Sequence, residues 1–203
     1  MVLPLYLAMS ALEFRPIPHG AFLMLEGTEV PPQGVLPVIT DHFPLEGQVL
    51  RRVCQGREAV LLDFEHPPTQ EIRAALQGLP CPCAAPPGYF DDGPVFLPPA
   101  PLITPLEAYL APFQGREIWL EAALQQQTIT VTAQGVAITP PSPSRDLTGG
   151  FYEQNLRCRF IQNFSEERAV FTLFDTPETL MKKLDDAAAL GVTRAVGLYQ
   201  ELG

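Results

Sequence analysis

Eight short runs of apolar residues recur along the 203-residue chain, and each run ends at turn-forming or polar residues. The runs are nearly continuous in apolar residues rather than alternating, which is typical of parallel strands that are buried on both faces. Eight such strands in one chain predict an α/β fold, a small (β/α)₈ TIM-like barrel. The predicted strands are residues 3–8, 21–25, 36–40, 59–64, 82–85, 94–97, 117–120 and 194–199.

Proline, with 23 residues, limits the number of helices that can connect these strands. Because proline breaks helices, many connections must be irregular, and the barrel is expected to be helix-poor. Three helices are predicted: residues 69–77, a short helix capped by Thr104, and residues 176–190. The last is the clearest, because Thr176 is a typical N-cap, Pro177 fits the first turn and Gly191 ends the helix.

The segment between the seventh and eighth predicted strands departs from the barrel pattern. Its apolar residues partly alternate with polar ones, and turn residues separate two strand pairs, which predicts two β-hairpins. The predicted hairpin strands are residues 128–132 with 136–139 and residues 157–163 with 168–173. We therefore expect one domain, residues 1–203, with a β-rich insertion at residues 122–174. An unpaired hairpin edge in the insertion would favour strand pairing with a second copy, as a homodimer.

The net charge indicates which classes of partner the protein disfavours, and the cysteines indicate the redox state of its compartment. The net charge of −10 argues against nucleic acid or an anionic membrane surface as a partner. No apolar stretch approaches the roughly 20 residues of a membrane span. The four cysteines contain no Cys-x-x-Cys pair, and Cys81-Pro-Cys83 is too tight for the usual zinc spacing. Since His19 and His66 also lack ligand spacing, we expect reduced thiols, a cytoplasmic location, and no metal or cofactor.

The carboxyl ends of the predicted strands carry many polar side chains, and this end of a barrel holds the working residues. These side chains are Ser10, Glu13, Glu26, Asp41, His42, Asp63, Glu65, Tyr89, Glu121, Gln200 and Glu201. Asp63 and Glu65 are two residues apart on one strand, so they point to the same face. Two neighbouring carboxyls push their pKa values apart, so that one can act as a general acid while the other stays ionised. Equally, both acids could cap the strand by accepting hydrogen bonds from loop amides.

Two segments resemble a known family. Ala-Val-Leu-Leu-Asp-Phe-Glu at residues 59–65 resembles the fourth-strand signature of chitinase-like glycoside hydrolases of family eighteen, which ends in Asp-aromatic-Glu. Residues 174–199, from Phe-Asp-Thr-Pro-Glu to Gly-Leu-Tyr, resemble the last helix and eighth strand of that family. The resemblance implies a TIM barrel that binds or cleaves an N-acetylglucosamine-containing glycan at its rim. It also implies that Glu65 protonates the leaving oxygen and that Asp63 positions the substrate's acetamido group.

The sequence departs from the family pattern at three places. One signature acid falls near Glu58 and another is replaced by Leu61. Leu97-Pro98-Pro99 replaces an aromatic–Asp pair, and Tyr199 stands where a tryptophan is expected. Two functions therefore stay open: a glycoside hydrolase-like protein, or a catalytically inactive barrel that serves as a carbohydrate-binding or protein-interaction module.

Five further residues are predicted to contact a saccharide: Glu121, Asp41, Tyr199, Gln200 and Glu13. Glu121 could instead form a salt bridge with Arg116, and Asp41 could hold a loop rather than pair with His42 as acid and base. Trp119 and Tyr199 could stack on a sugar ring, although a core position is more typical for Trp119.

Overall fold

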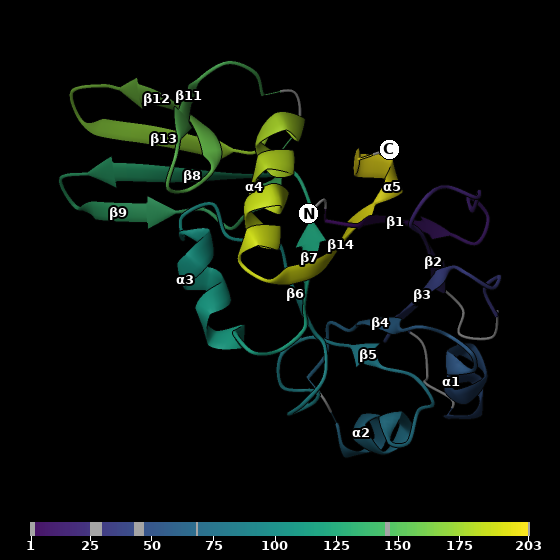
Figure 1. The fold of residues 1–203 in the computed structure, drawn as a ribbon. Helices are drawn as coiled ribbons and strands as arrows, with labels where there is room; N and C mark the ends of the chain where they lie inside the picture. Colours follow the sequence, from purple (N-terminus) through teal and green to yellow (C-terminus); the bar gives the residue numbers. More distant parts are fainter. Residues whose placement is uncertain (1–2, 25–29, 43–46, 68, 145–146, 203) are drawn as a thin grey trace.

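The computed structural model describes the chain except residues 1–2, 25–29, 43–46, 68, 145–146 and 203 (Figure 1). Eight strands pair in parallel in the order β5-β4-β3-β2-β1-β14-β7-β6. They are β1 (Leu5–Ser10), β2 (Gly20–Met24), β3 (Leu36–Thr40), β4 (Val60–Asp63), β5 (Cys83–Ala84), β6 (Val95–Leu97), β7 (Ile118–Ala122) and β14 (Val192–Leu198). The sheet is nearly closed, because Ala85 forms a parallel bridge with Val95 and accepts a 2.7 Å hydrogen bond from the Phe96 amide. The prediction of a helix-poor α/β barrel is confirmed.

Each of the eight predicted runs overlaps a barrel strand, and most boundaries differ by one to a few residues. Leu25, the predicted end of the second strand, lies outside the described residues. The eighth strand was predicted to include Tyr199, which is wrong, since β14 ends at Leu198 and Tyr199 begins a short helix. The chain turns into α5 directly after Leu198, so Tyr199, whose residue type favours a strand, lies in a helical turn instead.

Five helices lie in the described part of the chain, and none of them is both long and apolar enough to cross a bilayer. They are α1 (Gly47–Cys54), α2 (Gln70–Leu76), α3 (Leu106–Leu110, continued by the 3₁₀ turn Ala111–Phe113), α4 (Pro177–Ala189) and α5 (Tyr199–Leu202). Helix α4 begins as predicted, because Thr176 Oγ1 accepts a hydrogen bond from the Thr179 amide and Thr179 Oγ1 accepts one from the Thr176 amide. Thr104 does not cap α3, contrary to the prediction. The N-cap position is Pro105, and no side chain bonds to the first turn.

The barrel wall separates three apolar clusters. The inner cluster fills the barrel and contains Ala8, Ala21, Leu36, Val38, Ala59, Leu61, Ala84, Phe96, Trp119 and Val196. A second cluster lies outside β2–β5 under α1 and α2, and a third lies outside β6, β7 and β14 under α3 and α4 (Figure 1). Trp119 is fully buried in the inner cluster, and its Nε1 donates to Glu117 Oε1 at 2.8 Å. Trp119 is therefore a core residue and has no surface on which a sugar could stack.

A second, antiparallel sheet lies beside α3 and α4, on the side away from α1 and α2 (Figure 1). Its strand order is β10-β8-β13-β12-β11, with β9 paired to β8. The strands are β8 (Gln125–Thr132), β9 (Gly135–Ile138), β10 (Ser142–Pro143), β11 (Phe151–Glu153), β12 (Cys158–Phe164) and β13 (Arg168–Phe174). All six follow β7 and precede α4 in the chain. A small cluster of Leu102, Cys158 and Leu173 joins this sheet to the barrel.

Candidate functional site at the barrel mouth

The inner faces of β4 and β7 each end in a carboxyl group. Ala59, just before β4, and Leu61 on β4 belong to the inner cluster, and strand alternation places Asp63 next on the same face. On β7 the same alternation places Glu121 after the buried Trp119. Both carboxyls therefore project into the barrel at the carboxyl ends of their strands. This is the end of a parallel barrel at which functional groups gather.

A cavity of about 150 Å³ lies between these two side chains. Its lining residues are Ala8, Leu23, Val38, Thr40, His42, Leu61, Asp63, Phe96, Glu121, Val196, Gly197 and Leu198. The floor is apolar, and the polar groups are confined to Thr40, His42, Asp63 and Glu121. The buried Thr40 hydroxyl has no hydrogen-bond partner among the described residues. The cavity thus offers a ligand one unpartnered hydroxyl and two carboxyls above an apolar surface.

Glycine at position 197 is required by the close approach of β14 to β7. A Cβ atom there would lie 2.6 Å from the Ala122 carbonyl oxygen and 2.4 Å from Leu202 Cδ1. The first contact is with backbone, which cannot move without separating the two strands. Gly197 therefore holds the strand that carries Leu198 against the strand that carries Glu121.

The surroundings of Glu121 favour its protonated form. Burial raises the pKa of Glu121 to about 7, and the carboxylates of Asp63 and Glu201 contribute in the same direction. The pKa of Asp63 is also raised, first because the cavity walls remove part of its hydration and then because Glu65 and Asp41 repel its charge. No hydrogen bond from protein reaches either carboxyl within the part of the chain that the structure describes. A proton can therefore reside on Glu121 near neutral pH, which is the requirement for a general acid.

The predicted partner of Asp63 lies outside the cavity. The side chain of Glu65 is 72% exposed, and its Oε1 lies 3.9 Å from His42 Nε2. Glu65 does not line the cavity, although its charge raises the pKa of Asp63. The two residues are close to each other at the rim, but only Asp63 faces the enclosed space, because β4 ends at Asp63 and the alternation of its side chains ends there.

Asp41 holds a loop, which is the alternative that the sequence left open for it beside an acid–base pair with His42. Its side chain is only 3% exposed. Oδ1 accepts a hydrogen bond from the Glu65 amide at 3.1 Å, and Oδ2 accepts one from the His66 amide at 2.9 Å. Burial raises the pKa of Asp41, but these hydrogen bonds and a contact with the His66 ring outweigh it, so the pKa is lowered. Asp41 fixes the loop after β4 and thereby the position of Glu65.

The remaining predicted residues form a separate group at the ends of β1 and β14. Gln200 Nε2 donates to Glu13 Oε2 at 2.8 Å, and this bond lowers the pKa of Glu13. The Arg15 guanidinium lies 4.8 Å from the centre of the Tyr199 ring. These residues do not line the cavity; they follow the strands that carry its lining residues Ala8 and Leu198. Glu26 lies outside the described residues.

The sequence named Glu121 as an accessory acid, whereas the geometry makes it one of two central groups. The available signal was the run Ile118-Trp119-Leu120-Glu121, in which a buried aromatic residue two positions earlier places Glu121 on the inner face. Thr40 was not singled out from the sequence, because an unpartnered hydroxyl is visible only in three dimensions.

No protein-family model matches the chain, and no curated protein matches its sequence significantly. Two solved structures are similar in chain path. The spore cortex-lytic enzyme SleL of Bacillus cereus has 12% identity and a TM-score of 0.44, over 99% of this chain and 71% of that chain. The spore cortex-lytic enzyme SleL of Bacillus megaterium QM B1551 has 10% identity and a TM-score of 0.41, over 97% of this chain and 70% of that chain.

Proposed function

We propose that this chain is a glycoside hydrolase-like protein that binds or cleaves an N-acetylglucosamine-containing glycan at the carboxyl-terminal rim of its barrel. The observation that carries the proposal is a pair of carboxyls, Asp63 and Glu121, which lie above an apolar floor and accept no hydrogen bond from the described residues. Most glycoside hydrolases use two carboxyl groups beside the scissile bond, one of them protonated and the other ionised. A raised pKa keeps one member of such a pair protonated at neutral pH, so that it can act as the general acid.

Two residues are candidates for the acid. The resemblance to family eighteen assigns this role to Glu65, which stands exposed at the rim. The geometry favours Glu121, because its pKa of about 7 keeps it partly protonated at neutral pH and it faces the cavity. Asp63 then accepts a hydrogen bond from the acetamido N–H of the sugar, as the resemblance implies. Single variants of the two glutamates distinguish these assignments.

The size of the cavity limits what enters it. Pockets for drug-sized ligands occupy about 300–1,000 Å³, whereas this cavity has about 150 Å³. It can therefore admit part of one sugar residue, while neighbouring sugars would lie on the rim beside Glu13, Tyr199 and Gln200. The carboxamide of Gln200 and the ring of Tyr199 are groups that bind sugar hydroxyls and apolar sugar faces.

The test combines a binding screen with a turnover assay. Thermal shift with chito-oligosaccharides and peptidoglycan fragments measures binding, and release of reducing ends measures cleavage. We expect Glu121→Gln to keep binding and to lose turnover, while Glu166→Gln, in the exposed turn between β12 and β13, serves as the matched control. Loss of turnover in Glu65→Gln alone would assign the acid to Glu65 instead. A wild-type chain that binds no saccharide in the screen would refute the proposal, whereas binding without turnover would identify a carbohydrate-binding barrel.

A second candidate function is favoured by one face of the antiparallel sheet. Cross-strand register places Val136 beside Val131 and Ile138 beside Ile129 on the same face. The face continues to Phe164 of β12, and Val136, Ile138 and Phe164 are exposed. Contiguous exposed apolar side chains of this kind mark interaction surfaces. We therefore propose that a second copy of the chain covers this face, as a homodimer.

Sedimentation velocity measures this association directly. Val136→Lys should convert the dimer to a monomer, whereas a lysine at Thr130, on the opposite face of β8, should leave it unchanged. A wild-type chain that stays monomeric at concentrations of tens of micromolar would contradict the proposed dimer.

A further inference from the structure

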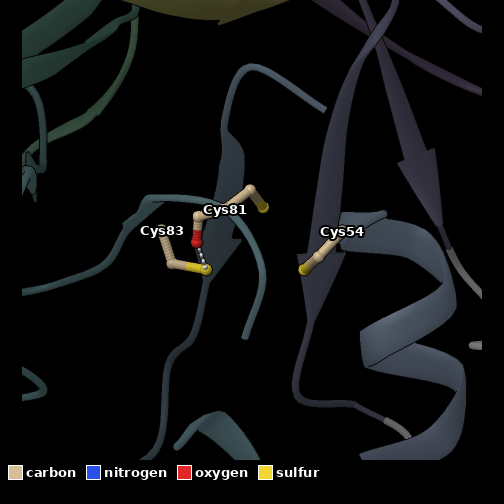
Figure 2. Close-up of side chains that lie close together, drawn as sticks. All are labelled: Cys54, Cys81 and Cys83. Carbon is tan, nitrogen blue, oxygen red and sulfur yellow. Dashed lines mark hydrogen bonds between the residues drawn. The ribbon is translucent and has the colours of Figure 1, made fainter. Parts of the chain in front are cut away.

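Three of the four cysteines meet on the outer side of the barrel wall. Cys54 is the last residue of α1, Cys83 is the first residue of β5, and Cys81 lies two residues before it. Their Sγ atoms all lie within 4.8 Å of one another. Figure 2 shows the side chains on facing segments, with the Cys83 Sγ directed to the Cys81 carbonyl oxygen at 3.6 Å. All three are free thiols.

The spacing of the sulfurs fits a bound metal ion. A metal–sulfur bond of about 2.3 Å places the sulfurs of a trigonal or tetrahedral site about 3.8–4.0 Å apart. The Sγ atoms lie within 4.8 Å of one another, so each sulfur needs to move by less than about 1 Å to reach the spacing of such a site. Small rotations about χ1 of Cys81, which is only half-buried, can supply this change without moving the backbone.

The three thiols lie between an apolar cluster and a surface depression. Cys54 and Cys83 belong to the apolar cluster under α1 and α2, which includes Val60, Leu62 and Leu76. On the other side a surface depression of about 340 Å³ reaches Cys81 and Cys83 and is bordered by Phe90 and Asp92. The thiols are thus shielded from bulk water on one side and accessible from the other, so that an ion has an entry path.

A cation from the protein lies near the cluster. The Arg57 guanidinium donates to the carbonyl oxygens of Pro31 and Pro32, while its Nε has no partner among the described residues. The guanidinium lies close enough to Cys54 and Cys81 to interact electrostatically with their sulfur atoms. Arg57 is therefore placed to offset the negative charge that several thiolates would bring together.

We propose that Cys54, Cys81 and Cys83 form a three-thiolate binding site for one soft cation, Cu(I) or Zn²⁺. Thiolates select these ions over Mg²⁺ and Ca²⁺, which require oxygen ligands. Cu(I) is satisfied by three sulfurs, whereas Zn²⁺ takes a fourth ligand, for which water from the depression is available. On binding, the ion displaces the protons of the thiols, which pass to solvent. The site is separate from the barrel mouth, because Cys54 and Cys83 face the outer cluster and Asp63 and Glu121 face the inner space.

Competition with chromophoric chelators tests the proposal on the full chain in reducing buffer. Cu(I) is offered as its bicinchoninate complex and Zn²⁺ as its 4-(2-pyridylazo)resorcinol complex, so the two arms identify the ion. We expect the wild-type chain to remove one equivalent of at least one ion. Cys81→Ser should weaken that binding roughly 100-fold or more, since the loss of a ligand exceeds the 10–100-fold cost of losing a residue that only supports one.

Two controls keep the result interpretable. Cys158→Ala removes the fourth cysteine, which is buried in the cluster beneath the second sheet, and should bind as well as the wild type. The melting temperature of the wild-type chain should rise with one equivalent of the bound ion, because ligands that bind only the native state stabilise it. Circular dichroism of each variant without metal shows that it is folded. A wild-type chain that leaves both ions with the chelators, or a folded Cys81→Ser chain that binds as tightly as the wild type, would overturn the proposal.

Discussion

Replacing Glu121 by glutamine should stabilise the protein at neutral and alkaline pH. The pKa of this carboxyl is about 7 in the folded chain, against an ordinary value of 4.5, because burial and the carboxylates of Asp63 and Glu201 disfavour its charge. The unfolded chain therefore releases the proton at lower pH than the folded chain. Below pH 4.5 both states are protonated and the contribution of Glu121 to stability is complete. As the pH rises from 4.5 to 7, the unfolded state is favoured progressively and this contribution is lost.

The magnitude follows from the shift. One pKa unit corresponds to 1.36 kcal/mol, so a shift from 4.5 to about 7 amounts to about 3 kcal/mol of unfolding free energy. Because Glu121 is only partly buried, solvent screening reduces this value, and we expect about 1–3 kcal/mol. Glutamine has the same shape and no charge, so Glu121→Gln should equal the wild type at pH 4 and exceed it by this amount at pH 8.

Urea unfolding of both proteins between pH 4 and pH 9 measures the difference. Charges elsewhere in the chain cancel when the two proteins are compared at the same pH. Glu166→Gln, at an exposed turn, should show no pH-dependent difference from the wild type. Asp63→Asn should shift the transition of the wild-type profile to lower pH, because it removes a carboxylate that repels Glu121. A stability difference between Glu121→Gln and wild type that is the same at pH 4 and pH 8 would refute the assignment of a raised pKa.

Three further predictions concern the scaffold and are all measured by urea unfolding. Lys183→Met should cost about 3–5 kcal/mol, because it leaves the buried Asp175 carboxylate, 2.8 Å from Lys183 Nζ, without its partner; a loss below about 1 kcal/mol would contradict this. Gly197→Ala should cost about 1–3 kcal/mol, because the new Cβ meets the Ala122 carbonyl oxygen at 2.6 Å. An alanine variant as stable as the wild type would show that the strands can separate freely. Trp119→Ala should cost about 3–5 kcal/mol, because it empties the centre of the inner cluster, and a cost near zero would place Trp119 outside the core.

The barrel could be predicted from the sequence because its strands are short, buried on both faces and punctuated by turns. A run such as Ala-Val-Leu-Leu at residues 59–62 has no polar position, and all four of its side chains are buried. Helix α4 could be predicted because Thr176, Pro177 and Gly191 mark both of its ends in the sequence. Helix α1 was not predicted, although Leu50, Val53 and Cys54 follow helical spacing, because the segment is only eight residues long and begins with Gly47, a poor helix former.

The site was only partly predictable. Alternation along the strand predicted that Asp63 and Glu65 point to the same face, but it could not show that β4 ends at Asp63 and that Glu65 lies outside the cavity. The role of Asp41 depends on hydrogen bonds to residues 24 and 25 positions away in the chain. The cysteine cluster was missed for the same reason, since Cys54 reaches Cys81 and Cys83 only when α1 packs against the barrel wall. Contacts between distant segments carry no signal in the spacing of a single sequence.

The central claim is that Asp63 and Glu121 face a common sugar-binding space at the mouth of the barrel. A crystal structure of the protein soaked with chitobiose tests it most directly. We expect a sugar residue in the cavity, with hydroxyl or acetamido groups within about 3 Å of the two carboxyls. Density for the sugar only at other surfaces, or carboxyls of Asp63 and Glu121 turned away from the cavity, would contradict the claim.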